Sequence, residues 1–196
     1  MTDPLYGEDD DANTPLTDEE RGQLIPTYIT LRRELNEAEL VNILAATRWV
    51  SGRKRDILDD GFLRQLHKRM FNQVWRWAGI YRTTARNIGM DAWRIAVEVR
   101  QLVDDVRFQI DHQTFEPDEI AVRFAHRLVS IHPFPNGNGR HSRLAGDLLA
   151  VQLGQPPFSW GRINLVDPGE TRKAYINALQ CADRHDIQPL LGFARL

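Results

Sequence analysis

A glycine-rich stretch that could hold phosphate groups lies at residues 131–143, Ile-His-Pro-Phe-Pro-Asn-Gly-Asn-Gly-Arg-His-Ser-Arg. Gly137 and Gly139 allow successive backbone N–H groups to turn inward as an anion-binding nest. A helix that starts near Gly139 adds the positive end of its dipole to that nest. Arg140 and Arg143 lie three residues apart in the first helical turn, so both guanidinium groups can reach one anion. The stretch therefore predicts a polyphosphate site.

His132 stands beside this nest and can accept a proton near neutral pH. An anion hole next to a candidate general base predicts phosphoryl or nucleotidyl transfer. Other glycine-rich loops fit less well, because a dinucleotide fingerprint needs glycine where Ser142 stands and a Walker loop needs Gly-Lys-Ser/Thr. The single cysteine, Cys181, excludes a disulfide framework and a cysteine-cluster zinc site.

The elements around this stretch are predicted to be helical, because apolar residues recur at helical spacing along most of the chain. Helices are expected at 17–20, from 36 onward, over 59–77, over 95–110, from 117 onward, over 139–154, over 171–183 and after 188. Residues 79–93 differ, because β-favouring residues stand next to the turn residues Asn87 and Gly89. The fold class is therefore expected to be all-α with one short β-hairpin.

Composition limits the class of protein. The 196 residues include 25 basic and 27 acidic side chains, and a net charge of −2 excludes a protein that holds nucleic acid by charge alone. We expect an acidic flexible tail at 1–13 and a single domain at 14–196. No apolar run is long enough for a membrane span, and the N-terminus lacks signal-peptide features, so a cytoplasmic location is expected.

Residues 132–143 resemble the signature of the Fic family, His-x-Phe-x-Asp/Glu-Gly-Asn-Gly-Arg-x-x-Arg, at seven of its fixed positions. The resemblance extends over about 57–190, where Trp-Ala-Gly at 77–79 looks like the family's entry to its flap. Tyr175 and residues 183–190 resemble the family's closing helices. The N-terminal arrangement is also similar to the Fic subgroup called mobile mystery protein B. The resemblance implies a Fic-type helical bundle with a short β-hairpin flap.

The family's activity, implied by resemblance, is transfer of part of a nucleotide to a protein hydroxyl. Most often AMP passes from ATP to Tyr, Thr or Ser of a target protein and pyrophosphate is released. His132 would then be the general base, and Phe134 a buried anchor of the loop. The phosphates would be bound by Gly137, Asn138, Gly139, Arg140 and Arg143. The flap would clamp the target as an added strand through Thr83, Thr84 and Trp93.

Asn136 departs from the family pattern, which has Asp or Glu at this position to help hold Mg²⁺. An amide oxygen can still bind this cation but carries no charge, so the metal would depend more on the phosphates. Two alternatives to an adenylyltransferase follow. One is a nucleotide-binding regulator or interaction protein with weak or lost transfer activity, and the other is a Fic enzyme that transfers another phosphate-containing group.

The sequence leaves the regulation open. Many Fic proteins block the arginine at the position of Arg140 with a glutamate from a Ser/Thr-x-x-x-Glu-Gly/Asn helix. The nearest match, at 30–35, has Glu34 without Gly or Asn after it, whereas Glu37 and Glu39 lie on the predicted helix without the Ser/Thr. An internal brake and a separate inhibitory partner of the toxin–antitoxin kind both stay open, and a homodimer is a further partner to consider.

The five histidines other than His132 have no predicted functional role. His67 has no recognisable partner pattern and is expected to be structural or at the surface. His141 lies in the helix after the glycine-rich turn and is expected to be exposed or behind the site.

Overall fold

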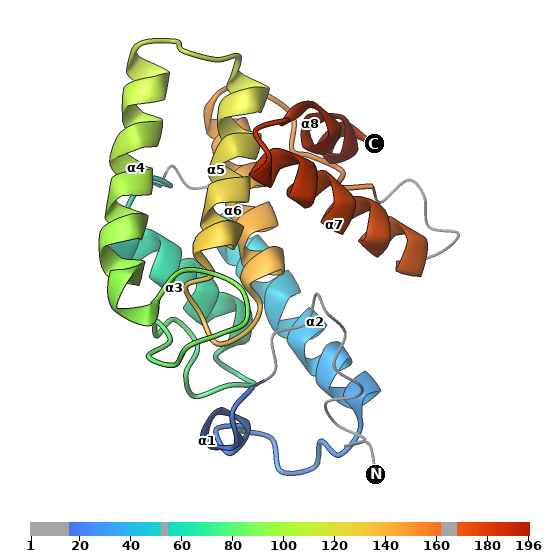
Figure 1. Ribbon diagram of the computed structural model, residues 1–196. Helices are drawn as coiled ribbons and strands as arrows, with labels where there is room; N and C mark the ends of the chain where they lie inside the picture. Colours follow the sequence, from blue (N-terminus) through green and yellow to red (C-terminus); the bar gives the residue numbers. More distant parts are fainter. Residues whose placement is uncertain (1–15, 52–54, 162–167) are drawn as a thin grey trace.

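A computed structural model gives the structure of residues 16–51, 55–161 and 168–196 (Figure 1). Within these ranges the chain is helical, and its only β pairing is a single bridge between Leu24 and Trp75. The all-α prediction is confirmed. The helices are α1 (Asp18–Arg21), α2 (Arg32–Val50), α3 (Asp60–Phe71), the 3₁₀ turn η1 (Ala92–Arg94), α4 (Ile95–Asp111), α5 (Pro117–Ile131), α6 (Asn138–Gln152), α7 (Pro168–Asp183) and α8 (Gln188–Arg195). The acidic tail predicted at 1–13 lies outside the described residues, and the division into tail and single domain stays a prediction.

Local sequence accounts for most helix starts. The Thr17 side chain caps α1 and Glu20 completes the capping box, while the Asp59 carboxylate accepts the N–H of Phe62 at 2.7 Å. Helix α2 begins four residues earlier than predicted from Asn36. The cause is Glu34, whose Oε2 accepts the N–H groups of Thr30 and Leu31 at 2.9 and 3.1 Å.

Helix α3 ends at Phe71, six residues earlier than predicted. The chain then turns, because the segment after α3 bonds to the segment after α1. The N–H of Ile25 donates to the carbonyl of Val74 at 2.8 Å, and the N–H of Arg76 donates to the carbonyl of Gln23 at 3.1 Å. This turn places the indole rings of Trp75 and Trp77 in the interior, 5.0 Å apart.

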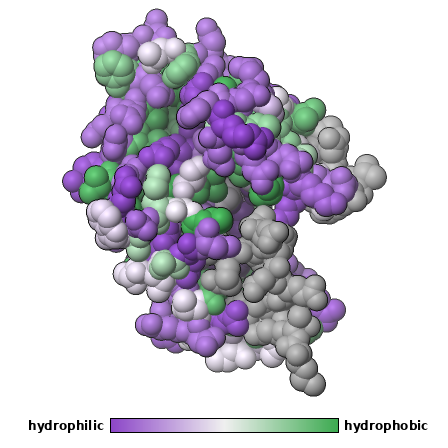
Figure 2. Space-filling view, viewed as in Figure 1, coloured by the Kyte–Doolittle hydropathy of each residue, from purple (hydrophilic) through white to green (hydrophobic). Residues whose placement is uncertain are grey.

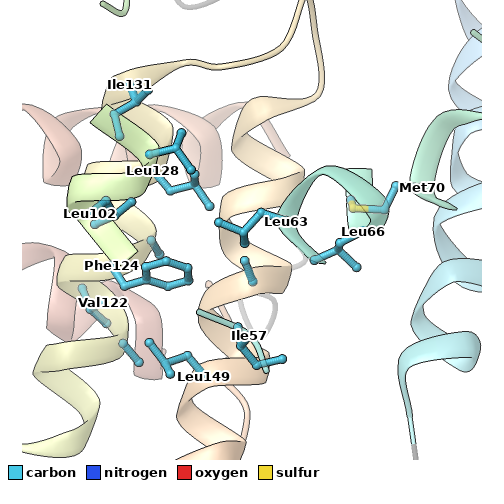
Figure 3. Packing of buried hydrophobic residues seen from close by; sticks show 14 of the residues in the cluster. Ile57, Leu63, Leu66, Met70, Leu102, Val122, Phe124, Leu128, Ile131 and Leu149 are labelled. Atoms are coloured by element: carbon cyan, nitrogen blue, oxygen red, sulfur yellow. The ribbon is translucent and has the colours of Figure 1, made fainter. Parts of the chain in front are cut away.

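The core lies where α5 and α6 pack against α3 and α4 (Figure 3). Phe124 and Leu128 of α5 face Leu63 of α3 and Leu149 of α6, and all four side chains are buried. A Cβ at Gly146 would lie 2.9 Å from that of Ala125, so α5 and α6 approach more closely than a larger residue would allow. The predicted phosphate loop connects these two helices directly, so their close packing fixes both ends of the loop.

The predicted β-hairpin at 79–93 is wrong, because no strand forms among residues 79–93. Arg82 is the physical reason. Its guanidinium donates to the carbonyls of His132 at 2.7 Å and Thr84 at 2.8 Å, and also to that of Met90. The backbone N–H of Arg82 bonds the carbonyl of Pro133 at 2.9 Å, and that of Met90 bonds the carbonyl of Ile131 at 3.1 Å. The backbone of both arms therefore pairs with residues 131–133, and the bond between the arms runs through the Arg82 side chain.

The surface seen in Figure 2 is mostly hydrophilic, with hydrophobic side chains scattered over it. None of the helices in the described ranges has the length and apolar character needed to cross a membrane. The exposed apolar residue that stands out at the start of α4 is Trp93, whose side chain is 81% exposed.

Candidate active site

His132 lies at the C-terminal end of α5, where its backbone turns into the left-handed conformation with φ of 56°. This turn directs the chain into the glycine-rich loop between α5 and α6 (Figure 1). The 79–93 loop covers the side chain, because a Cβ at Gly89 would lie 2.5 Å from the Cβ of His132. Glycine at this position is therefore required for the loop to lie over the histidine.

The electrostatics of His132 favour the neutral imidazole. Burial, together with the charges of Arg82 and Arg86, lowers the pKa of His132 to about 4, although a hydrogen bond to the Val129 backbone opposes the shift. The ring is thus uncharged at neutral pH and has one nitrogen able to accept a proton. This is the protonation state that a general base needs.

The loop after His132 is held by its own side chains. Phe134 is completely buried, as expected of an anchor, and its ring stacks on that of His67 with centroids 3.7 Å apart. Asn138 spans the turn, because its Oδ1 accepts the N–H of Phe134 at 2.9 Å and its Nδ2 donates to the carbonyl of Phe134 at 2.8 Å. Both ends of the Asn138 amide are therefore used within the loop in this conformation, and its role in phosphate binding stays a prediction.

Gly137 precedes α6 and has a φ of +79°, and a Cβ there would lie 2.5 Å from the Phe71 ring. Its N–H donates to the Oδ1 of Asn136 at 2.5 Å. Asn136 in turn lines a hollow that also contains Arg140 and Glu39. The structure thus brings Asn136, the N-terminus of α6 and Arg140 to one place.

Glu39 of α2 is the main site residue that the sequence did not assign. Its Oε2 pairs with Nη1 of Arg140 at 2.5 Å, and its Oε1 accepts the indole N–H of Trp75 at 2.7 Å. Only 5% of Glu39 is exposed. A signal was available, because Glu39 shares the buried face of α2 with Leu35 and Asn42, where an acid needs a partner. Glu34, the nearest match to the family's inhibitory pattern, instead caps the start of α2.

Arg143 is separated from Arg140 in this conformation. Its guanidinium carbon lies 4.8 Å from the centroid of the Tyr175 ring of α7, which is a cation–π distance. Arg140 itself lies 4.9 Å from the Phe71 ring while it pairs with Glu39. The two arginines predicted to share an anion therefore face the site from different sides.

Two histidines lie behind the loop, and both are completely buried. The Nδ1 of His67 accepts the N–H of Gly79 at 3.0 Å, and its Nε2 lies 3.0 Å from the carbonyl oxygen of Asn136. The Nε2 of His141 lies 2.9 Å from the carbonyl oxygen of Leu63. Of the two alternatives expected for His141, exposed or behind the site, the structure shows the second. The partners of His67 could not be predicted, because they lie far from it along the chain.

The predicted target-binding residues lie on the 79–93 loop and its end. Thr83 and Trp93 are exposed, whereas Thr84 is half-buried and donates from Oγ1 to Glu20 of α1 at 3.2 Å. Glu20 also forms an ion pair with Arg86 of the loop. Helix α1 thereby fixes this loop from the N-terminal side.

Metal-binding groups are few. Among the described residues no cluster of three or more His, Cys, Asp or Glu side chains could hold a metal ion by itself. The neutral Oδ1 of Asn136 and the carboxylate of Glu39 are the oxygen donors at the hollow, and Glu39 is occupied by Arg140. A divalent cation fits here only together with ligands that a bound molecule supplies.

A sequence model of the Fic/DOC family matches residues 57–150, which include α3, the covering loop, α4, α5 and most of α6. Residues 57–150 form a Fic/DOC domain. The subgroup of this family stays a prediction.

Named relatives of this Fic/DOC domain include protein adenylyltransferase fic-1 of Caenorhabditis briggsae, which is 32% identical over 184 residues. That match covers 89% of this chain and 34% of the relative, so the chain spans about a third of the length of the curated protein. Protein adenylyltransferase Fic of Drosophila melanogaster is 36% identical over 80 residues, which cover 41% of this chain and 15% of that protein.

Solved Fic structures have the same fold as this Fic/DOC domain. Fic-1 of Caenorhabditis elegans matches with a TM-score of 0.67 and 24% identity, over 90% of this chain and 52% of that chain. BepC of Bartonella tribocorum, solved with bound AMPPNP, matches with a TM-score of 0.69 and 20% identity, over 91% of this chain and 97% of that chain. At these identities the likeness concerns the fold.

Proposed function

We propose that this chain is a protein adenylyltransferase that transfers AMP from ATP to a Tyr, Thr or Ser hydroxyl of a target protein and releases pyrophosphate. The observation that carries the proposal is the position of His132 at the end of α5, directly before a glycine turn that opens α6. Two observations on similar proteins support it: curated relatives are named protein adenylyltransferases, and solved Fic structures from Bartonella hold AMPPNP or ADP.

The proposed reaction uses His132 as the general base. The imidazole accepts the proton of the target hydroxyl while the hydroxyl oxygen forms a bond to the α-phosphorus of ATP. The bond from that phosphorus to the bridging oxygen breaks, and pyrophosphate leaves with the electron pair. Backbone N–H groups of Gly137 and Gly139 at the N-terminus of α6, together with Arg140 and Arg143, hold the charge that develops on the phosphates.

ATP would bring Mg²⁺ with it, and Asn136 would be the neutral protein ligand of that ion beside the phosphates. The bound cation supplies positive charge that offsets the charge of the phosphates. The variant Asn136→Glu should strengthen Mg²⁺-dependent nucleotide binding, measured by calorimetry with and without the metal. Equal binding by both proteins would mean that residue 136 does not contact the ion.

Glu39 is proposed as an internal brake. The carboxylate holds Arg140 in the hollow where the outer phosphates of ATP would bind, and Trp75 fixes the carboxylate in place. A nucleotide can use Arg140 only after this ion pair separates. Glu39 is thus the residue that we propose for the internal brake that the sequence left open, and a separate inhibitory partner stays open beside it.

The loop over His132 is proposed to bind the target. Trp93 offers a large exposed apolar side chain at the end of this loop, and Thr83 offers an exposed polar group. In this conformation the Thr84 hydroxyl bonds Glu20 of α1 and does not form part of an open surface. Because the loop bonds residues 131–133, a target that binds along it would lie next to His132.

A second candidate function is a nucleotide-binding regulator that does not transfer AMP, which Asn136 favours because it brings no charge to the metal. A Fic enzyme that transfers another phosphate-containing group is a third. An inhibitory protein of the toxin–antitoxin kind, a homodimer, a cytoplasmic location and the lack of a nucleic acid partner all stay predictions.

The variant Glu39→Gln, incubated with ATP, Mg²⁺ and a cell lysate, tests the proposal. Mass spectrometry is expected to find AMP on hydroxyl side chains, together with released pyrophosphate, and Glu39→Gln combined with His132→Ala should abolish both. Nucleotide binding without an adduct or pyrophosphate would favour the regulator instead. Equal yields from both variants would exclude His132 as the base.

A further inference from the structure

His67 is a buried titratable side chain that the proposed chemistry does not use. It comes from α3, whereas its two hydrogen-bond partners lie in the turn after α3 and in the phosphate loop. One face of its ring stacks on Phe134, with an interplanar angle of 15°. The side chain is completely buried, so both ring nitrogens have protein partners and neither contacts solvent.

The partners of His67 determine where its proton lies. Nδ1 accepts the backbone N–H of Gly79 at 3.0 Å, so Nδ1 carries no proton. The ring proton is therefore on Nε2, which donates to the carbonyl of Asn136 at 3.0 Å. Burial, followed by the charges of His141 and Arg140, lowers the pKa of His67 well below its usual value, so the ring stays neutral and this tautomer persists.

The bond from Nε2 sets the orientation of the peptide group that joins Asn136 to Gly137. A trans peptide is planar, and its C=O and N–H point in opposite directions. Because the carbonyl of Asn136 points at His67, the N–H of Gly137 points away from α3. The N–H of Gly137 donates to the Oδ1 of Asn136, whose side chain lines the hollow together with Arg140.

This peptide needs an external hold. Gly137 has no Cβ and has a φ of +79°, so rotation of the preceding peptide group meets little steric resistance from residue 137 itself. A rotated peptide would present the carbonyl oxygen of Asn136 to the hollow, where it would repel an anion. The other strong hold in the loop, the Asn138 amide, acts on Phe134 and not on this peptide.

We propose that His67 is a positioning residue that fixes the Asn136–Gly137 peptide so that the Gly137 N–H is offered to a phosphate oxygen of the bound nucleotide. In the conformation described here the Oδ1 of Asn136 accepts that N–H, and a phosphate oxygen would replace it. The inference rests on the proposed nucleotide site and adds to it a residue from outside the Fic signature.

Two variants separate the two contacts of His67. In His67→Gln the side-chain amide nitrogen can reach the position of Nε2 and donate to Asn136, while the bond to Gly79 is lost. In His67→Asn the shorter amide can accept from Gly79, while the donor to Asn136 is lost. Each variant removes one buried hydrogen bond, so thermal unfolding should report similar losses of stability. His141→Asn is a matched control, because it changes a neighbouring buried histidine that does not contact Asn136.

The measurement is the binding of inorganic pyrophosphate and of AMPPNP to each variant in a Glu39→Gln background, which frees Arg140. We expect His67→Asn to weaken both affinities by roughly 10- to 100-fold, the scale of one fixed anion donor. We expect His67→Gln and His141→Asn to stay within about threefold of the parent. AMP transfer, measured with a fixed target, should follow the same order in KM for ATP.

Equal affinities in His67→Asn and His67→Gln would overturn the proposal, as would a parent that binds neither anion. Pyrophosphate binding that depends on His67 without any AMP transfer would refute the proposed function and leave the positioning role intact. If the His67 variants do not fold, a measurement on the protein that keeps His67 still tests the proposal. The ¹⁵N shifts of the His67 ring should indicate a protonated Nε2 and an unprotonated Nδ1, and the opposite tautomer would also overturn the proposal.

Discussion

Replacing Glu39 should release the site for nucleotide. In the structure its carboxylate is 2.5 Å from the guanidinium of Arg140, and the side chains are 6% and 35% exposed. Two unit charges about 4 Å apart attract by about 4 kcal/mol at an effective dielectric constant near 20. Solvent around the partly exposed Arg140 reduces this figure, so we expect a net gain of about 1.4 to 2.7 kcal/mol in ATP binding. That gain corresponds to a 10- to 100-fold lower Kd.

Two substitutions separate charge from packing at this position. Glu39→Gln removes the charge and keeps an oxygen that can accept the indole N–H of Trp75, so most of the gain in affinity should appear at little cost in stability. Glu39→Ala leaves that buried indole N–H without a partner and should lower the free energy of unfolding by about 1 to 3 kcal/mol. Thermal unfolding in the absence of nucleotide measures this difference.

The assay is calorimetric titration with AMPPNP and Mg²⁺, followed by transfer rates at saturating ATP. Glu37→Gln is the matched control, because Glu37 lies two residues before Glu39, on the exposed side of α2. Its Kd should equal that of the unmodified protein. An unchanged Kd in Glu39→Gln, or an equal gain in Glu37→Gln, would refute the role of Glu39 as a brake.

Four further predictions concern the pH dependence of transfer, the pH dependence of stability, the loop over His132 and the target surface. Because the pKa of His132 is lowered to about 4, the transfer rate of Glu39→Gln should stay level from pH 8 to about 5 and fall only below that; a decline centred near 6.5 would contradict the assignment. His132 and His141 both have pKa values lowered to about 4, so between about pH 4 and 6.5 the unfolded chain binds more protons than the folded chain. As the pH drops through this window, the free energy of unfolding should fall by up to about 1.4 kcal/mol per pH unit for each histidine, which chemical denaturation measures. Gly89→Ala should lower the transfer rate at least tenfold, since its Cβ would lie 2.5 Å from that of His132. Gly154→Ala is the control, because Gly154 has a similar positive φ in open space and its replacement should lower stability alone. Equal transfer rates in both variants would show that the clash with His132 is not the cause. Trp93→Ala should raise KM for the target severalfold and leave the Kd for AMPPNP and the unfolding temperature unchanged, and a shift in the nucleotide Kd would remove Trp93 from the target surface.

Local chemistry made most helices predictable. Thr17, Asp59 and Pro117 mark helix starts by capping or by a fixed φ, and these effects act within a few residues. The glycine turn that opens α6 was predictable for the same reason, because Gly137 and Arg140 are neighbours in the chain.

The loop at 79–93 was not predictable from local preferences. Its β-favouring residues indicated a hairpin, but the Arg82 guanidinium binds three carbonyls, one of them that of His132, 50 residues away. Tertiary hydrogen bonds of this kind override strand propensity, because a buried guanidinium without acceptors would cost more than the lost ladder.

Two further residues of the candidate site could not be identified from the sequence, because their partners lie far away along the chain. Glu39 meets Arg140 from a distance of 101 residues along the chain, and His67 meets Asn136 from 69. Periodicity showed that Glu39 lies on the buried face of α2, but only the folded arrangement of α2, α3 and α6 identifies the group that each side chain contacts.

The most direct test of the central claim is to supply Glu39→Gln with ATP that is labelled in either its α- or its γ-phosphate and to measure the label on target protein. Transfer of AMP predicts label on protein from the α-position only, and none when His132 is also replaced by Ala. Label from the γ-position would contradict adenylyl transfer, and α-label that persists without His132 would contradict the proposed general base.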